Sequence, residues 1–339
     1  MRTPGPIYDF ANAADYARAV DLAVDIGNND LQHGQVMLAN DSRFNQSFFS
    51  QGLTDYAVGG WNGTDINREV QAIFGLPVSV PRRFSHKVWD NAEAFLSDPD
   101  EDIRAIGGDF KAVRLTTTEV ERKTLNRGLI YVIDTDEITD INVEEQSAVL
   151  YLTNRLLLNS IRRGIALLDA AGTNTARTWN SSSNPDSDLR TSLRTAADVS
   201  GLRPNNMVIG DAAWDIRWGA YAAQATAGAF GGVPLTPEGL AAQLGLDRAF
   251  VSKARYTSAA AVRTGVVASK IWSYYTSMSG RREDPSNIKR FFSPTLGGGP
   301  IRVFRQQVSE KKIILGVEHY ELIAITYSGG IREETVAAS

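Results

Sequence analysis

The chain contains no cysteine, only three histidines and no long apolar run. Without cysteine it can form neither disulfides nor thiolate metal sites, so packing, strand pairing and contacts with other chains must hold the fold. No apolar stretch approaches the roughly 18 residues that a membrane helix needs. Residues 1–6 are not followed by the apolar core of a signal peptide. We therefore expect no membrane partner, and synthesis in the cytoplasm of the cell that makes the protein.

An excess of basic charge is also missing. The chain has 35 Lys and Arg against 39 Asp and Glu, for a net charge of −4. A protein that grips nucleic acid electrostatically usually carries a basic excess that displaces counterions. Balanced charges of both signs instead favour protein–protein contacts. Two short basic groups, at 281–282 and 289–290, are interpreted as surface charge paired with Glu283 and Asp284, and not as a DNA-facing patch.

The residue patterns of several common catalytic and ligand sites are absent as well. There is no Gly-x-Ser-x-Gly turn and no Gly-x-x-x-x-Gly-Lys phosphate loop. The histidines, His33, His86 and His319, are far apart and have no two-histidine metal spacing. The acidic run at 98–102 fits a helix start, and the run at 134–137 lacks the calcium-loop spacing. The sequence therefore predicts no catalytic residue, no cofactor and no metal, and a protein that is not an enzyme.

Helical spacing is strongest over residues 142–171. Leu157, Ile161, Ile165 and Leu168 recur at intervals of three to four residues on one face. The pattern Asn142-x-x-Glu145 is typical of a capping box, and Gly172 supplies a stop. At 1.5 Å per residue, this segment predicts a helix roughly 45 Å long.

The segment before this helix predicts a projecting hairpin. Residues 110–120 alternate and are rich in Thr and Val, which indicates a strand, and residues 129–133 are expected to form the return strand. Neither face of the first strand is strongly apolar, so the hairpin suits contacts with partners better than a monomer core. Its charged residues are the candidate inter-subunit contacts: Arg114, Glu119, Glu121, Arg122 and Lys123.

The rest of the chain mixes helices and strands without regular alternation. Residues 173–185 are interpreted as a polar loop. Helices are expected at 187–198, 212–218 and 236–245, and strands at 207–210, 250–254, 271–275, 301–305, 311–316 and 319–327, with Gly316 interrupting the last two. This order predicts an α+β fold and not a doubly wound sheet.

Several short motifs occur in a fixed order along the second half. Residues 203–210 are followed by Ala213-Trp214, residues 235–241 by 244–246, and then Ile271-Trp272 and residues 303–305 follow. This colinear series resembles the major capsid protein of tailed bacteriophages, whose fold is shared with encapsulin nanocompartments. The resemblance covers most of the chain and is weakest in residues 1–80. Each motif alone is unspecific, so the shared order carries the resemblance.

The resemblance implies the capsid protein fold with five segments. These are an N-terminal arm (1–79), an extended β-hairpin loop (80–135), a peripheral domain (136–199) with a spine helix at 142–171, an axial domain (200–286), and closing strands of the peripheral domain with the C-terminus (287–339). Some family members begin with a long helical scaffolding segment. Here only about 80 residues precede the loop and they lack coiled-coil heptads, so we expect a separate scaffolding protein or a processed chain.

The resemblance also implies a function. The chain is expected to self-assemble into the icosahedral shell that encloses the double-stranded DNA of a tailed phage. The expected partners are copies of itself in pentamers and hexamers, possible scaffolding, portal and cement proteins, and packaged DNA bound non-specifically. It would be assembled in the host cytoplasm and reside in the virion. Two alternatives stay open: an encapsulin-like shell around a cargo enzyme, and an α+β enzyme with an unrecognised site.

Overall fold

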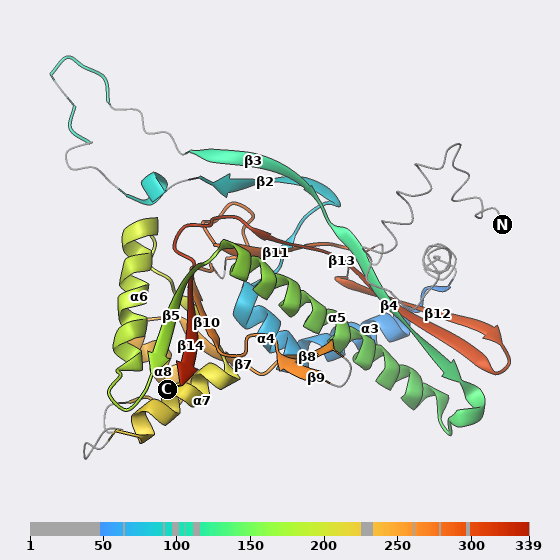
Figure 1. The fold of residues 1–339 in the computed structure, drawn as a ribbon. Helices are drawn as coiled ribbons and strands as arrows, with labels where there is room; N and C mark the ends of the chain where they lie inside the picture. The colour runs from blue at the N-terminus through green and yellow to red at the C-terminus, as the bar shows by residue number, and fades with distance from the viewer. Residues whose placement is uncertain are drawn as a thin grey trace, which may run out of the picture. The chain divides into compact units, whose positions relative to one another are not determined.

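The chain folds into two compact units. Figure 1 shows the helices and strands of the described residues as a ribbon. The computed structural model describes residues 48–63, 65–90, 92–96, 102–104, 106–110, 116–224, 233–259, 262–277, 279–295 and 299–338. Unit 1 contains residues 1–59, 128–153 and 301–318. Unit 2 contains residues 60–127, 154–300 and 319–339. Neither unit is one continuous stretch of sequence, because the chain passes between them several times.

Helices and strands are both abundant in the described residues. The helices are α3 (Gln51–Gly63), α4 (Asp65–Phe74), α5 (Ile141–Ala171), α6 (Pro185–Ser200), α7 (Asp211–Ala222) and α8 (Pro237–Leu244), with 3-10 turns η3 (Ala92–Phe95) and η4 (Thr135–Glu137). The strands are β1 (Val78–Ser79), β2 (Arg83–Trp89), β3 (Thr117–Lys123), β4 (Leu125–Asp134), β5 (Thr173–Trp179), β6 (Asn206–Gly210), β7 (Arg248–Ser252), β8 (Arg255–Ala259), β9 (Val262–Gly265), β10 (Lys270–Tyr274), β11 (Ile288–Ser293), β12 (Ile301–Ser309), β13 (Lys312–Ile325) and β14 (Arg332–Ala338). The predicted α+β class is confirmed.

The long helix α5 confirms the strongest prediction from sequence. It has 31 residues, which corresponds to about 46 Å. Its buried apolar side chains recur with helical spacing and include Leu157, Ile161, Ile165 and Leu168. At its end the amide of Gly172 donates to the carbonyl of Leu168 over 2.8 Å, which satisfies one of the last free carbonyls.

The predicted capping box at the start of α5 is wrong. The Asp140 carboxylate caps the helix, because it accepts from the amides of Asn142 at 2.9 Å and Val143 at 3.4 Å. Glu145 does not turn back toward the cap. Its carboxylate accepts from Arg305 Nε of β12 at 2.7 Å, so it joins two elements of unit 1.

Strands β12 and β13 pair with each other. The start of α3 is hydrogen-bonded to β12 in unit 1. The amide of Ser50 donates to the carbonyl of Val303 at 3.1 Å, and the amide of Val303 donates to Thr54 Oγ1 at 3.1 Å. The predicted break at Gly316 is wrong, since β13 runs unbroken for 14 residues. Glycine weakens a strand but does not end it when neighbouring strands supply the pairing.

Unit 2 is built on a five-stranded mixed sheet with the order β5-β14-β10-β6-β7. The outer pairs β5–β14 and β6–β7 are parallel, and β10 pairs antiparallel with both β14 and β6. Strand β5 corrects a prediction, because residues 173–179 were expected to be part of a polar loop. Pairing with β14 along its whole length holds this polar segment extended.

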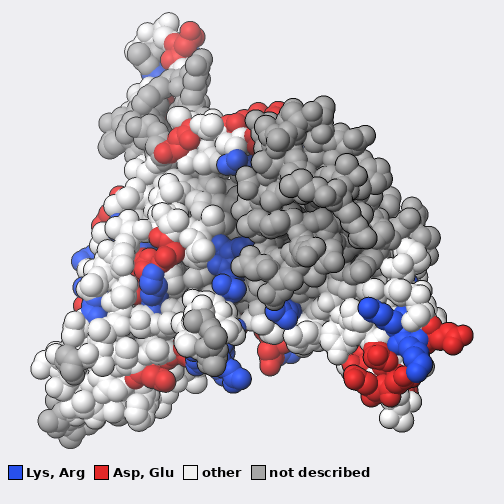
Figure 2. Space-filling model, turned by 45° about the vertical axis from the view of Figure 1, so that its right-hand side comes forward, with Lys and Arg blue, Asp and Glu red and all other residues white. Residues whose placement is uncertain are grey.

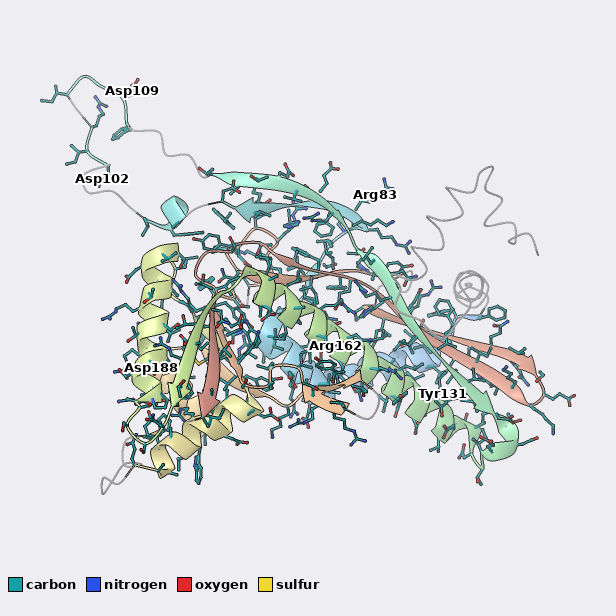
Figure 3. All side chains as sticks on the ribbon, viewed as in Figure 1. Arg83, Asp102, Asp109, Tyr131, Arg162 and Asp188 are labelled. Carbon is teal, nitrogen blue, oxygen red and sulfur yellow. The ribbon has the colours of Figure 1, made fainter. Side chains whose placement is uncertain are left out.

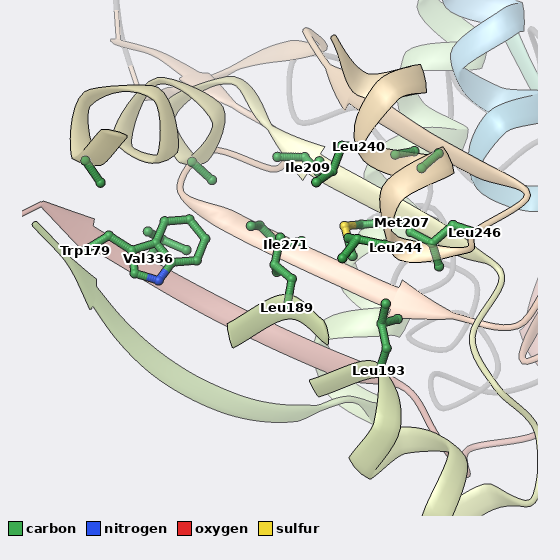
Figure 4. Packing of buried hydrophobic residues seen from close by; sticks show 14 residues of the cluster. Trp179, Leu189, Leu193, Met207, Ile209, Leu240, Leu244, Leu246, Ile271 and Val336 are labelled. Carbon is green, nitrogen blue, oxygen red and sulfur yellow. The ribbon is translucent and has the colours of Figure 1, made fainter. Parts of the chain in front are cut away.

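One face of this sheet packs against α6, α7 and α8. Their apolar side chains meet those of the strands in a single buried cluster, in which Trp179 lies beside Val336 and Met207 beside Leu244 (Figure 4). Helix α8 begins and ends as its sequence predicts: Thr236 Oγ1 accepts from the amide of Gly239 at 3.1 Å, and Gly245 adopts a left-handed φ of 68°.

Helix α4 and the end of α5 pack against the opposite face of the sheet. Side chains alternate along a strand, so Lys270 lies on the face opposite to the buried Ile271. Lys270 pairs with Asp169 of α5 and with Glu333. The Tyr274 hydroxyl donates to the carbonyl of Ile73 in α4 at 2.8 Å. The sheet is therefore covered on both faces, which explains why β6, which lies between β10 and β7, is fully buried.

Helices α4 and α5 cross closely at Gly164. A Cβ atom there would lie 2.1 Å from Cζ of Phe74, well inside contact distance. Gly164 and Phe74 are both buried. Gly164 therefore allows the two helices to approach closely at this point. None of the helices in the described ranges is both long and apolar enough to cross a membrane.

We predict that Gly164→Ala destabilises the protein although alanine favours helix. The added methyl group must displace Phe74, at a cost of about 1–3 kcal/mol. Urea unfolding measures the change. The matched control is Gly219→Ala in α7, where no atom lies within 4 Å of the new Cβ and where a gain of up to about 1 kcal/mol is expected. Adding Phe74→Leu to Gly164→Ala should restore part of the loss. Equal effects at the two glycines would contradict the close crossing.

Candidate inter-subunit surface

Strands β2 and β3 form a separate two-stranded ribbon in unit 2 (Figure 1). They pair antiparallel over seven residues, from Arg83↔Lys123 to Trp89↔Thr117. This corrects the predicted hairpin, in which residues 129–133 were to be the return strand for β3. Those residues do form part of a strand, β4, but the partner of β3 is β2, which precedes it in sequence.

The inward face of the ribbon is held by aromatic packing. Phe84 and His86 of β2 are buried, and their rings lie 4.9 and 5.2 Å from the ring of Phe291 in β11. Burial lowers the pKa of His86, and the nearby cations Arg122 and Lys289 lower it further. His86 is thus a neutral packing residue at physiological pH.

The base of the ribbon is tied to the adjoining strands by polar contacts. Thr124, which follows β3, shares a hydrogen bond of 2.8 Å with the hydroxyl of Ser293. The Arg82 guanidinium lies 4.0 Å from the ring centroid of Tyr320 in β13, and Asn126 donates to the Tyr320 hydroxyl at 3.3 Å. These contacts fix where the ribbon leaves the sheet of β1, β11 and β13.

The outward face of the ribbon carries three of the five predicted contact residues. Alternation along β3 puts Glu119, Glu121 and Lys123 on one face, and all three are exposed. Across the ribbon, Arg83 and Lys87 share this face. Glu119 accepts a hydrogen bond from the Ser85 hydroxyl, and Lys87 Nζ lies 3.4 Å from Glu283. Figure 3 shows Arg83 pointing outward from the ribbon.

The other two predicted contact residues are placed differently. Arg122 is exposed but belongs to the inward face, where it is paired across the ribbon with Phe84. Arg114 lies outside the described residues. The face of mixed charge expected for partner contacts therefore consists of Arg83, Lys87, Glu119, Glu121 and Lys123. We call these five residues the ribbon face. Figure 2 shows both signs of charge mixed over the described atoms of the side in view.

The segment that joins β2 to β3 exposes large apolar side chains. Ile103 and Phe110 are 68% and 70% exposed, and Ile106 is exposed as well. The Arg104 guanidinium lies 5.6 Å from the ring centroid of Phe110. These three exposed apolar side chains are candidates for contact with another surface.

A buried charge cluster lies next to the base of the ribbon in unit 2. Glu321 of β13 is 1% exposed, and it pairs with Arg290 of β11 at 2.7 Å and with Arg163 of α5 at 2.5 Å. Burial by itself would raise the pKa of Glu321, but Arg290 and Arg163 outweigh burial and hold this pKa below its usual value. The carboxylate therefore stays ionised.

This cluster corrects the prediction for residues 289–290. Lys289 and Arg290 are 3% and 5% exposed, so they are not surface charges. Lys289 does pair with Asp284 as predicted, at 2.9 Å, and it also donates to the carbonyl of Arg282 at 2.8 Å. The signal that could have indicated this cluster is Glu321, an acidic residue that alternates with apolar residues near one end of a predicted strand, because an acidic residue is rarely buried without a partner.

The acidic and histidine residues that the sequence singles out are placed as follows in the described part of the chain. It contains no group of three or more His, Asp or Glu residues that could hold a metal ion. The acidic run at 134–137 forms η4, where the Asp134 side chain accepts from the amide of Asp136 at 3.1 Å. His86 and His319 are both buried, and His33 lies outside the described residues.

Comparison with solved structures identifies the fold. A phage-related protein from Bordetella bronchiseptica RB50 is similar with a TM-score of 0.62 and 16% identity, over 84% of this chain and 96% of that one. A virus-like particle from Pyrococcus furiosus has a TM-score of 0.48 and 11% identity, over 86% and 100% of the two chains. A putative capsid protein of a prophage of E. coli CFT073 has a TM-score of 0.48 and 10% identity, over 84% and 99%.

The first similarity shows that this chain shares the fold of that phage-related protein over most of both chains. No protein-family model and no curated protein matches the sequence. At 16% identity the likeness concerns the fold alone. What the fold is used for depends on the surfaces described above.

We predict that the buried cluster makes stability depend on pH through His319. Burial is the main cause that lowers the pKa of His319 to about 4. The charge of Glu321 raises this pKa, and the charge of Arg290 lowers it. The unfolded chain takes up the proton as the pH falls through about 6.5, but the folded chain does so only near the lowered value. Stability should therefore be lost between pH 6.5 and 4, by up to about 3 kcal/mol.

Urea unfolding of wild type and His319→Gln across this pH range measures the effect. The variant should lose the part of the slope that His319 contributes. His86 shifts in the same direction, and both proteins share its contribution. Parallel slopes for the two proteins would show that His319 does not titrate in this way.

Proposed function

We propose that this chain is the major capsid protein of a tailed phage, a subunit that self-assembles into a closed shell around double-stranded DNA. The observation that carries this proposal is the ribbon: it is anchored at one face and at its base, while its other face carries exposed charges and its connecting segment carries exposed apolar side chains. These exposed side chains have few partners within the described part of the chain. A neighbouring copy could supply such partners.

The order of elements supports the same function. The ribbon precedes the long helix α5, a mixed block of helices and strands follows, and long strands come near the end of the chain. This is the order expected from the resemblance to capsid proteins, with β2 and β3 in the extended loop, α5 as the spine helix, and β6 to β10 in the axial domain. The shared fold with a phage-related protein adds to it.

The proposed partners follow from this function. Copies of the chain would form pentamers and hexamers, and scaffolding, portal and cement proteins would join them. Packaged DNA would be held by confinement and weak contacts, because the net charge of −4 gives no electrostatic grip on it. Many weak contacts repeated by closed symmetry can still give a stable particle. Assembly would take place in the host cytoplasm, and the virion would be the final location.

An encapsulin-like shell remains the second candidate, because the resemblance stated for the sequence covers both. The two differ in what the particle contains. Nucleic acid inside particles made during infection supports the phage shell, and a co-purified cargo enzyme supports the nanocompartment. No observation on the described residues favours the third alternative, an α+β enzyme.

We predict that reversing two cations of the ribbon face abolishes shells but not folding. Arg83→Glu with Lys123→Glu changes two exposed residues that are opposite each other in the ribbon. Exposed substitutions of this kind usually change stability by no more than about 0.5 kcal/mol. Negative-stain microscopy of the purified variant should show no particles, whereas wild type forms them.

The matched control reverses two exposed cations of α6, Arg190→Glu with Arg194→Glu, which changes the net charge equally. The control should form shells. If the ribbon variant forms normal shells, the ribbon face is not an inter-subunit contact. If wild type itself yields only monodisperse monomers or dimers, the proposed function is wrong.

A further inference from the structure

Strand β5 is an outer strand of the five-stranded sheet of unit 2. The sheet order is β5-β14-β10-β6-β7, so β5 pairs with β14 and with no other strand among the described residues (Figure 1). All seven residues of β5 pair with β14 in one uninterrupted register. Asn174, Ala176 and Thr178 of β5 are exposed. One edge of β5 is therefore paired, and the other has no strand beside it in the described part of the chain.

The main-chain groups on the unpaired edge of β5 belong to alternate residues. The amide of Thr173 donates to the carbonyl of the residue before β14 at 3.1 Å, so the main-chain groups of Thr173 point toward β14. Main-chain groups of alternate residues in a strand point to opposite edges. The N–H and C=O groups of Asn174, Ala176 and Thr178 therefore point away from β14. Within the described residues one hydrogen bond reaches them, from the Ser183 hydroxyl to the carbonyl of Thr178 at 3.4 Å.

This edge lacks the usual protection against another strand. Natural proteins protect an outer strand with lysine, proline, a bulge or a covering element, because its unpaired main-chain groups can bind another strand. Strand β5 has no Lys, no Pro and no bulge. Its charged residue, Arg177, is paired with Glu334 at 2.7 Å. The other outer strand, β7, differs, because its Arg248 and Ser252 both bind α4. Strand β5 is therefore the edge of this sheet that can accept a strand.

A second copy of β5 matches this edge by symmetry. When two identical strands pair antiparallel about a two-fold axis at Ala176, Asn174 of each copy lies opposite Thr178 of the other. These three residues carry the outward N–H and C=O groups, so they form the hydrogen-bonded pairs, with about six main-chain hydrogen bonds in all. No like charges lie directly opposite each other, and the two alanines at the axis are small.

We propose that β5 pairs antiparallel with β5 of a second copy, so that the two five-stranded sheets become one continuous sheet. The contact is isologous, because the same residues of both copies meet. It uses none of the residues of the ribbon face. The inference does not rest on the proposed shell function, and it makes the free subunit a dimer.

Substitutions at Ala176 test this pairing. Ala176→Lys and Ala176→Glu each place two like charges opposite each other at the axis, which opposes pairing. Sedimentation velocity of the free wild-type subunit should give twice the chain mass of 37.0 kDa. Each variant alone should dissociate, with the dissociation constant of the dimer raised about tenfold or more. An equimolar mixture of the two variants should restore the dimer, because lysine then lies opposite glutamate.

The matched controls are Ala242→Lys and Ala242→Glu. Ala242 is exposed on α8, which packs against β7 at the other end of the sheet, so both controls should dimerise as wild type does. The inference is overturned if the free wild-type subunit is a monomer at every concentration. It is also overturned if either Ala176 variant dimerises as tightly as wild type, or if the mixture of the two remains monomeric.

These outcomes are separable from the proposed function, because sedimentation resolves free subunits from large particles in the same run. If wild type forms shells and its free fraction is monomeric, the β5 pairing is wrong and the shell function stands. If the free subunit dimerises through β5 but no shells form under any condition, the pairing stands and the shell function is wrong.

Discussion

The packing of Phe84 and His86 against Phe291 is the interaction on which the proposed role depends. A two-stranded ribbon is marginally stable in water unless one of its faces packs on something else. Here β2 supplies that face, and the aromatic contacts to β11 hold it. The strand β3 contributes little to the core, so its side chains are free to be polar. Strand β2 thus anchors the ribbon, while β3 carries most of its exposed charged side chains.

The interior of unit 2 contains several buried ion pairs. Arg217 pairs with Asp186 at 2.7 Å, with both side chains almost fully buried, and Glu321 holds two arginines. Buried ion pairs add little net stability, but breaking one is costly. A buried ion pair instead favours the one packing of helices and strands in which both charges are paired. A subunit that must repeat the same shape many times in a closed shell gains from such specification.

The sequence predicts best those elements whose signals are local. Helix α5 follows from its apolar spacing, and α8 follows from the cap at Thr236 and the left-handed Gly245. Strand β5 was missed because its residues are polar and only its pairing with β14 keeps it extended. The cap of α5 was misplaced by two residues, since Asp140 and Asn142 are equally good capping types and only the backbone distinguishes them.

The ribbon face was predictable in part, because its strand alternation is also a local signal. Alternation assigns Glu119 and Glu121 to one face of a strand, and their polarity indicates that this face is not in a core. Alternation does not reveal which strands pair with each other. The sequence therefore predicts residues 129–133 of β4 as the partner of β3, whereas in the structure the partner is β2. The buried charge cluster could not be predicted from the sequence, because Arg290 and Glu321 are 31 residues apart. Only the pairing of β11 with β13 brings them together.

Shell assembly through exposed ribbons is the central claim, and its concentration dependence tests it most directly. Sedimentation velocity of the purified wild-type protein over a series of concentrations distinguishes free subunits from closed particles. The account predicts a sharp threshold, with free subunits or small rings below it and one large, uniform species above it. A single species with the mass of a monomer or dimer at every concentration and salt condition would contradict the account.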